Sequence, residues 1–227
     1  MNALSKNEIL TAEQKMLLKQ FSTSALRDLY YLTGGTALAA FHLQHRYSED
    51  LDLFTENEVP VEQVMAFVKS LPGLIHADYE HKFDRRIFLL RFEHQAAFKV
   101  EFTGYPFRRL EPGVVIDGVV IDSVRDIVAN KLAAMTERRD AKDFADIYCA
   151  VNSKGLDLAT LVRDAETKFG IRGIMQILQG RFLQPPPSTS TLRMRAPLPE
   201  DALREYFLQT ARQWIAKSVD DAERADS

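Results

Sequence analysis

Two short stretches of the sequence carry residue types suited to phosphate and metal chemistry. The first is a double glycine followed by threonine, Gly34-Gly35-Thr36, at the start of an apolar segment. The second alternates acidic and apolar residues and contains Asp50 and Asp52. Because side chains two positions apart in a strand point the same way, the two aspartates are predicted to share one face of a strand.

The paired aspartates indicate a site for a divalent cation. Two carboxylates held this close repel each other unless a cation lies between them, and hard oxygen ligands suit Mg²⁺ or Mn²⁺. A third acid, Glu101, alternates with Val100 and Phe102 and is predicted to face away from the core. If its strand lies beside the aspartate strand, three carboxylates converge. The alternative interpretation is that both strands merely expose a solvated charged face.

The double glycine indicates a site for an anion. A turn from a strand into a helix exposes backbone N–H groups, which favour phosphate, and glycine permits a close approach to the backbone. The hydroxyl of Thr36 adds either a helix cap or a phosphate ligand. In the alternative interpretation, the two glycines only turn the chain.

These residues must be positioned by a mixed arrangement of strands and helices. In the first part of the chain, apolar residues at helical spacing predict helices over 12–31, 37–44 and 60–71. Alternating and β-branched residues predict strands over 30–33, 50–55, 73–83, 86–92 and 97–103, and a hairpin over 114–121. From Ser123 onward the pattern is helical, with predicted helices over 123–137, 140–151, 157–169, 171–182 and 199–217. We therefore predict an α+β fold with a core over 1–122 and a helical C-terminal lobe over 123–227.

Composition sets outer limits on the function. The 227 residues are 46% hydrophobic and 27% charged, which is an ordinary globular mixture. The net charge of −3 excludes a chain that is basic all over, but it allows a local basic patch. The single cysteine, Cys149, cannot form an internal disulfide. Neither a signal peptide nor an apolar run long enough to cross a membrane is visible, so we expect a cytoplasmic protein without membrane contact.

The predicted C-terminal lobe begins with a basic block. Lys131, Arg138 and Lys142 recur at helical spacing and would share one face of an unbroken helix. Three cations on one face suit a triphosphate, and Asp143 and Asp146, one turn apart, could orient the lysines or, less readily, bind metal. The alternative is a set of ordinary surface ion pairs.

In combination, these stretches resemble the AbiEii/AbiGii-type nucleotidyltransferase family, which belongs to the DNA polymerase β-like nucleotidyltransferases. The resemblance covers roughly residues 28–150. It rests on three groups of residues. The first is the glycine turn, Gly34-Gly35-Thr36-Ala37-Leu38, and the second joins the two acidic stretches, His45-Arg46-x-Ser48-x-Asp50-Leu51-Asp52-Leu53-Phe54 and Lys99-Val100-Glu101-Phe102. The third is the later block, which consists of Asp126-x4-Lys131, Arg138 and Lys142-Asp143-x-x-Asp146. Family members commonly carry serine after the first glycine and often aspartate at the position of Glu101.

The resemblance implies a nucleotidyltransferase-like sheet and a role for each matching residue. The nucleoside triphosphate is expected to contact Gly34, Gly35, Thr36, Arg46, Ser48, Lys131, Arg138, Lys142 and Asp146. Asp50 and Asp52 would bind two Mg²⁺ or Mn²⁺ ions. Glu101 would bind the catalytic ion and act as the base, and Lys131 would neutralise the triphosphate.

The implied reaction transfers NMP from an NTP to an acceptor hydroxyl, with RNA such as tRNA as the expected acceptor. The resemblance further implies the toxin of a type IV-like toxin–antitoxin or phage-defence system, with a cognate antitoxin as partner. Two alternatives keep the fold but change the function. One transfers NMP to a protein or small-molecule acceptor, and the other is a catalytically degenerate nucleotide-binding module.

Overall fold

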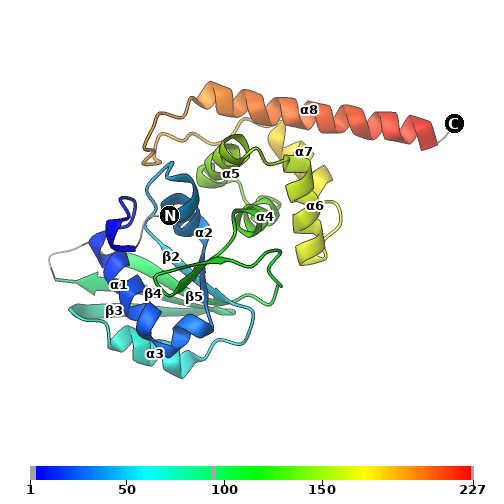
Figure 1. The fold of residues 1–227 in the computed structure, drawn as a ribbon. Helices are drawn as coiled ribbons and strands as arrows, with labels where there is room; N and C mark the ends of the chain where they lie inside the picture. Colours follow the sequence, from blue (N-terminus) through cyan, green and yellow to red (C-terminus); the bar gives the residue numbers. More distant parts are fainter. Residues whose placement is uncertain (1–3, 94–95, 226–227) are drawn as a thin grey trace. The chain divides into compact units, whose positions relative to one another are not determined.

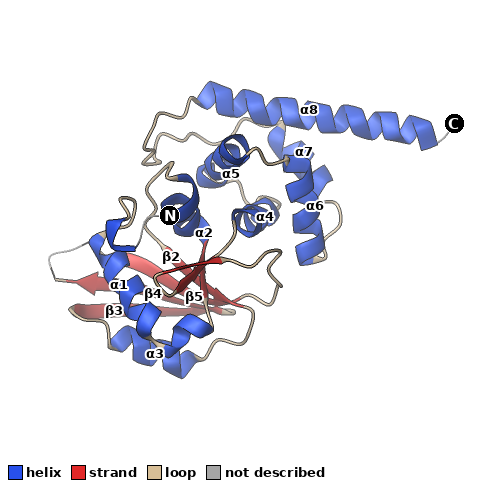
Figure 2. Cartoon of the chain, in the orientation of Figure 1, coloured by secondary structure: helices blue, strands red, loops and turns tan. Residues whose placement is uncertain are grey.

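The chain folds into two compact units. The structure is a computed structural model that describes residues 4–93 and 96–225. The units divide between Ile127 and Val128, inside the helix α4 (Val124–Ala134). The first unit carries the strands, and the second is helical (Figures 1 and 2). This confirms the predicted α+β fold with helices in the C-terminal part.

One mixed sheet organises the first unit. In the described residues it has seven strands in the order β3-β4-β5-β2-β1-β7-β6. Their bounds are β1 (Tyr31–Thr33), β2 (Leu51–Thr55), β3 (Leu74–Lys82), β4 (Arg85–Phe92), β5 (Phe98–Gly104), β6 (Val114–Ile116) and β7 (Val119–Ile121). Strand β2 runs parallel to β5 and antiparallel to β1, while β1 runs parallel to β7. The remaining neighbours are antiparallel.

Strand alternation separates the core face of the sheet from its polar face. Leu51 and Leu53 of β2 are fully buried, as are Val100 and Phe102 of β5. The helices α1 (Ala12–Thr23) and α3 (Val61–Lys69) cover this apolar face, as Figure 1 shows. The Phe102 ring lies edge-on to the rings of aromatic residues from several elements, namely Tyr30, Phe67 and Phe88. The acidic side chains between these apolar residues therefore belong to the opposite face.

The helices of the first unit follow local capping rules. Helix α1 begins with a capping box between Thr11 and Gln14. It ends at Thr23 rather than continuing to 31, because Ser24 leaves the helical conformation and caps the short helix η2 (Ala25–Asp28). The first described helix is η1 (Leu4–Lys6). The helix after β1 begins at the first glycine, as α2 (Gly34–Ala37), and continues with π-type spacing as η3 (Leu38–Leu43).

The second unit packs aromatic residues between helices. After α4 come α5 (Ala141–Lys154), α6 (Leu158–Phe169), α7 (Ile174–Phe182) and α8 (Glu200–Ala225). The rings of Phe144, Phe182 and Phe207, one from each of α5, α7 and α8, contact one another in its core. None of the helices in the described residues is long and apolar enough to cross a membrane.

The break between α4 and α5 corrects one expectation. The basic block was expected to share a face if one helix carried it throughout. Helix α4 ends at Ala134, and α5 starts at Ala141 with Asp140 as its N-cap, whose side chain accepts a hydrogen bond from the Lys142 N–H. Lys131 therefore lies on one helix, Lys142 on the next, and Arg138 in the segment between them.

Candidate active site

Two of the three predicted carboxylates belong to neighbouring strands, and the third directly precedes one of them. Asp52 of β2 lies opposite Glu101 of β5 in the parallel register, and opposite Thr33 of β1 in the antiparallel register. Residues in register on adjacent strands point to the same side. Asp50 precedes β2 by one residue and contacts the same face. The expectation that the strand of Glu101 lies beside that of the aspartates is confirmed.

The glycine turn contacts Asp52 directly. Gly34 has φ of +72°, a left-handed conformation that side chains rarely adopt. A Cβ atom built on Gly34 would lie 2.1 Å from Oδ2 of Asp52. Glycine is therefore required here both by the backbone conformation and by the carboxylate. Within the first unit, the turn therefore lies directly against the aspartate strand.

The second glycine contacts two of the expected nucleotide-binding residues. A Cβ on Gly35 would lie 2.6 Å from Nη2 of Arg46 and 3.1 Å from Oγ of Ser48. Arg46 is only 4% exposed, and its Nη1 donates a hydrogen bond to the Tyr47 carbonyl at 3.0 Å. The backbone of Gly35, a guanidinium and a hydroxyl therefore lie together.

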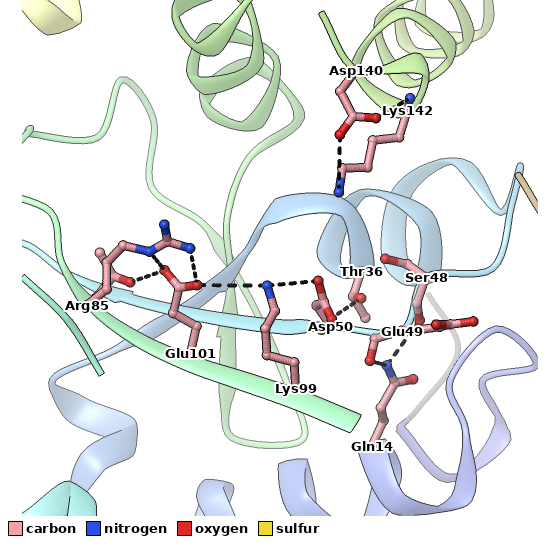
Figure 3. Close-up of polar contacts among 11 residues, drawn as sticks. Gln14, Thr36, Ser48, Glu49, Asp50, Arg85, Lys99, Glu101, Asp140 and Lys142 are labelled. Atoms are coloured by element: carbon pink, nitrogen blue, oxygen red, sulfur yellow. Dashed lines mark hydrogen bonds and ion pairs between the residues drawn. The ribbon is translucent and has the colours of Figure 1, made fainter. Parts of the chain in front are cut away.

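The segment that carries Ser48 is held by a side chain from α1. Nε2 of the buried Gln14 donates to the carbonyl oxygens of Ser48, at 3.1 Å, and Glu49, at 2.9 Å (Figure 3). The same Gln14 side chain accepts from the Thr11 N–H at 3.0 Å as part of the capping box. The start of α1 thus fixes the chain just before the aspartates.

The hydroxyl of Thr36 connects the glycine turn to the segment that carries Asp50. Thr36 is fully buried, and its hydroxyl donates to the backbone carbonyl of Asp50 (Figure 3). We expected this hydroxyl to be a helix cap or a phosphate ligand. In the structure it ties the glycine turn to the aspartate segment, and its contact with a phosphate stays a prediction.

Glu101 is buried and tightly paired, so the alternative of a solvated strand face is wrong for this residue. It is 3% exposed. Arg85 of β4 donates to its two carboxylate oxygens at 2.5 and 2.6 Å, and the Thr103 hydroxyl donates to Oε1 at 2.7 Å. Burial works to raise the pKa of Glu101, but the hydrogen bonds from Arg85 and Thr103 hold that pKa below its usual value. Arg85 and Thr103 thus occupy both oxygens of the carboxylate, and the role of Glu101 as the base stays a prediction.

A second cation lies among the acids. Nζ of Lys99 is 3.0 Å from Oδ2 of Asp50 and 4.0 Å from Oε2 of Glu101 (Figure 3). Burial works to lower the pKa of Lys99, but the hydrogen bond and charge of Asp50, with the charges of Asp52 and Glu101, raise it above its usual value. Lys99 is therefore held in its charged form.

The donor set determines how a metal would fit. Within residues 4–93 and 96–225, no three His, Cys, Asp or Glu side chains are grouped closely enough to hold a metal ion. Asp50 and Asp52 supply hard oxygen donors on one face, which suits Mg²⁺ or Mn²⁺. The third acid, Glu101, already binds Arg85. The residues therefore fit a divalent ion at the two aspartates, with Lys99 as the competing cation.

The remaining predicted residues lie in the second unit, where all of them except Lys142 belong to one cluster. Nζ of Lys131 lies 2.8 Å from both Asp143 and Asp146, and Arg138 lies 2.9 Å from Asp143. Burial works to lower the pKa of Lys131, but the charges of Asp146 and Asp143 raise it above its usual value. Lys142 pairs with Asp140 at 3.5 Å. The two aspartates orient Lys131, and the role of Lys131, Arg138, Lys142 and Asp146 in nucleotide binding stays a prediction.

Several residues that shape the site were given no role there by sequence reasoning. Arg85 and Lys99 neutralise the acids, Gln14 holds the Ser48 segment, and Asp122 accepts a hydrogen bond from the Thr33 hydroxyl at 2.7 Å. The role of Lys99 could have been predicted from the sequence, because Lys99 lies two residues before Glu101 and therefore on the same side of the strand. No sequence pattern indicated the role of Arg85, because its contact with Glu101 depends on the register between β4 and β5.

Replacing Gly34 by alanine tests the contact with Asp52. Gly73 provides a matched control, because it also has φ of +72° but a Cβ there would have nothing within 4 Å. Each variant should lose about 1–2 kcal/mol through left-handed strain. Gly34→Ala should lose about 1–3 kcal/mol more through overpacking against Asp52. Urea unfolding measures both variants, and equal losses would contradict the contact.

Replacing Glu101 by glutamine tests its ion pair through pH. The pKa of Glu101 is lowered in the folded protein, so its ionised form stabilises the fold above the ordinary value of 4.5. That contribution is lost as the pH falls through the lowered pKa. Above pH 4.5, Glu101→Gln should reduce the free energy of unfolding by about 1.5–3 kcal/mol. At lower pH the difference from the wild type should shrink.

The control for this pH series is Glu58→Gln, at an exposed position between β2 and α3. Its difference from the wild type should stay small throughout. A Glu101→Gln difference that did not change with pH would contradict the assigned ionisation.

Comparison with known proteins identifies the family of this chain and proteins that share its fold. The family described as "Nucleotidyl transferase AbiEii toxin, Type IV TA system" matches residues 16–223. An uncharacterized protein of Aquifex aeolicus, aq_aa25, is 31% identical over 164 residues, which cover 70% of this chain and 76% of that protein.

Two crystal structures from Helicobacter pylori share the fold. JHP933 matches with a TM-score of 0.60 at 16% identity, covering 94% of both chains. A second protein, provisionally described as a nucleotidyltransferase, matches with a TM-score of 0.59 at 16% identity, covering 90% of this chain and 92% of that one. The family match spans most of the sequence, and the chain therefore belongs to the AbiEii nucleotidyl transferase toxin family of type IV toxin–antitoxin systems.

Proposed function

We propose that this protein is a divalent-metal-dependent nucleotidyltransferase that transfers NMP from an NTP to a hydroxyl of an RNA acceptor such as tRNA. Pyrophosphate is the second product. Within the family's toxin–antitoxin setting, the protein would be the toxin, with a cognate antitoxin as its partner. The observation that carries the proposal is the contact between the Gly34 backbone and the Asp52 carboxylate, because it joins an anion-binding turn to a cation-binding pair.

The anion side of the site is built around Gly35. A backbone N–H at the start of a helix favours phosphate oxygens, and the guanidinium of Arg46 and the hydroxyl of Ser48 lie against the same glycine. A guanidinium and a hydroxyl are strong donors to phosphate. We assign the triphosphate of the NTP to these three groups.

The cation side is built from Asp50 and Asp52. Bound Mg²⁺ would neutralise the triphosphate and stabilise the pyrophosphate leaving group. Asp50 is held by the Thr36 hydroxyl at its backbone, and Asp52 is held by the register between β1, β2 and β5. Glu101 contributes negative charge beside them while it stays paired with Arg85. Because NTP is the substrate, we propose that the protein works in the cytoplasm, where NTPs are available.

Other acceptors would use the same NTP site. Transfer to a protein or a small molecule requires only a different acceptor, and a degenerate module would keep binding but lose transfer. The presence of Asp52 and Glu101 on adjacent strands, with Asp50 just before the first of them, supports a catalytic protein over a degenerate one.

Asp52→Asn tests the proposal, because it removes a charge from the cation side and keeps the shape. Purified protein, Mg²⁺, radiolabelled NTPs and tRNA are incubated, and both pyrophosphate and labelled RNA are measured. The variant should lose at least about 100-fold in rate, as expected for loss of a group that acts on the developing charge. Asp84→Asn, at an exposed position beyond β3, should react like the wild type.

The outcomes separate the alternatives. If a protein or a small molecule from a cell extract takes up the radioactive label and tRNA does not, that molecule is the acceptor in place of RNA. NTP binding without any pyrophosphate would support the degenerate module. Full activity in Asp52→Asn would contradict the assigned cation side.

A further inference from the structure

Lys99 occupies a special place on the acid face. Strand β5 alternates apolar residues toward the core with Lys99 and Glu101 on the other side. Its neighbour β2 brings Asp52 to the same side, and Asp50 lies just before β2. Nζ of Lys99 therefore lies between Asp50 and Glu101, at 3.0 Å from the first and 4.0 Å from the second (Figure 3).

The two cations on this face differ in how firmly they are bound. Arg85 grips Glu101 through two parallel hydrogen bonds, a geometry that fixes both partners. Lys99 makes a single short contact with Asp50, through a flexible stem that can redirect its ammonium group. The carboxylates differ as well, because the side chain of Asp50 is 40% exposed and that of Glu101 only 4%. Lys99 is thus the exchangeable cation and Arg85 the fixed one.

The net charge of the acid face depends on whether Lys99 is present. Three carboxylates, Asp50, Asp52 and Glu101, stand against two cations, Arg85 and Lys99, so these five side chains sum to −1. Without Lys99 the sum would be −2. A divalent ion at Asp50 would meet the ammonium as a like charge at short range, and like charges at such distances repel strongly.

We propose that Lys99 is a resident counterion that a divalent metal must displace from Asp50, and that its ammonium then transfers to a phosphate of the incoming nucleotide. The proposal rests on the nucleotidyltransferase function proposed above. It makes the site selective for metal that arrives together with nucleotide. A free metal ion displaces Lys99 without providing it a new partner, whereas a metal–NTP complex brings phosphate oxygens for the ammonium.

The lysine is suited to this exchange because the fold does not depend on it. An ion pair this exposed contributes little to stability. Removing the ammonium therefore leaves the sheet intact, and metal affinity can be measured on a folded variant. Lys99→Met keeps much of the length of the side chain and removes only its charge.

Binding of Mn²⁺ alone, without nucleotide, tests the proposal directly. The unbound ion is followed by electron paramagnetic resonance as protein is added. Lys99→Met should bind Mn²⁺ about 10-fold more tightly than the wild type, which lies within the range of ordinary coupling between two ligands. Lys99→Arg, which keeps the positive charge, should stay close to the wild type. Lys82→Met, at an exposed position on β3, is the matched control and should change nothing.

Repeating the titration with a non-hydrolysable NTP analogue tests the transfer to phosphate. The analogue should raise the Mn²⁺ affinity of the wild type, and it should raise that of Lys99→Met by a clearly smaller factor. Circular dichroism and urea unfolding check that each variant is folded.

The results distinguish this inference from the function on which it rests. Equal Mn²⁺ affinity in the wild type and Lys99→Met would overturn the counterion role, even if the wild type transfers NMP. Equal enhancement by the analogue in both proteins would overturn the transfer of the ammonium to phosphate. Failure of both proteins to bind Mn²⁺, with or without the analogue, would overturn the metal assignment and this inference together.

Discussion

The contact between Gly34 and Asp52 is the constraint on which the rest of the site depends. A carboxylate oxygen occupies the place where any other residue at position 34 would put its Cβ. The contact requires β1 to end beside β2, and the register of Thr33 with Asp52 provides that. It also requires the turn to stay in place, and the hydrogen bonds from Thr33 to Asp122 and from Thr36 to Asp50 hold it on both sides. The proposed phosphate side and the proposed metal side are therefore set by one local geometry.

The second constraint is the charge of the acid face. Three carboxylates on one face of the sheet repel each other, and burial makes an unpaired charge more costly. The structure offsets this with Arg85 on the buried Glu101 and with Lys99 beside the partly exposed Asp50. The doubly hydrogen-bonded pair is found where the carboxylate is buried, and the single contact of Lys99 where the carboxylate is partly exposed. In the second unit, too, buried carboxylates hold a cation, because Asp143 and Asp146 both bind Lys131.

Much of the first unit could be predicted from local patterns, because its signals are local. Strand alternation at Asp50–Leu53 and at Glu101 correctly predicts which residues face the core, and the double glycine marks the turn. The hairpin around Asp117 and Gly118 follows from its turn residues. Other features could not be predicted from the sequence, because they depend on contacts between residues that are distant along the chain. The pairing of Arg85 with Glu101 needs the β4–β5 register, and the burial of the Thr36 hydroxyl needs the Asp50 carbonyl beside it. The break between α4 and α5 was missed because the basic residues keep helical spacing across it, while the cap at Asp140 restarts the helix.

The central claim is that the glycine turn and the paired aspartates form one nucleotide site. Its most direct test is a crystal structure of the protein grown with Mn²⁺ and a non-hydrolysable NTP analogue, with the ion located by its anomalous scattering. The account predicts the anomalous peak at the carboxylates of Asp50 and Asp52, and a phosphate of the analogue at the Gly35 N–H beside Arg46. An ordered triphosphate and metal bound elsewhere on the protein, with the turn and aspartates free of both, would contradict it.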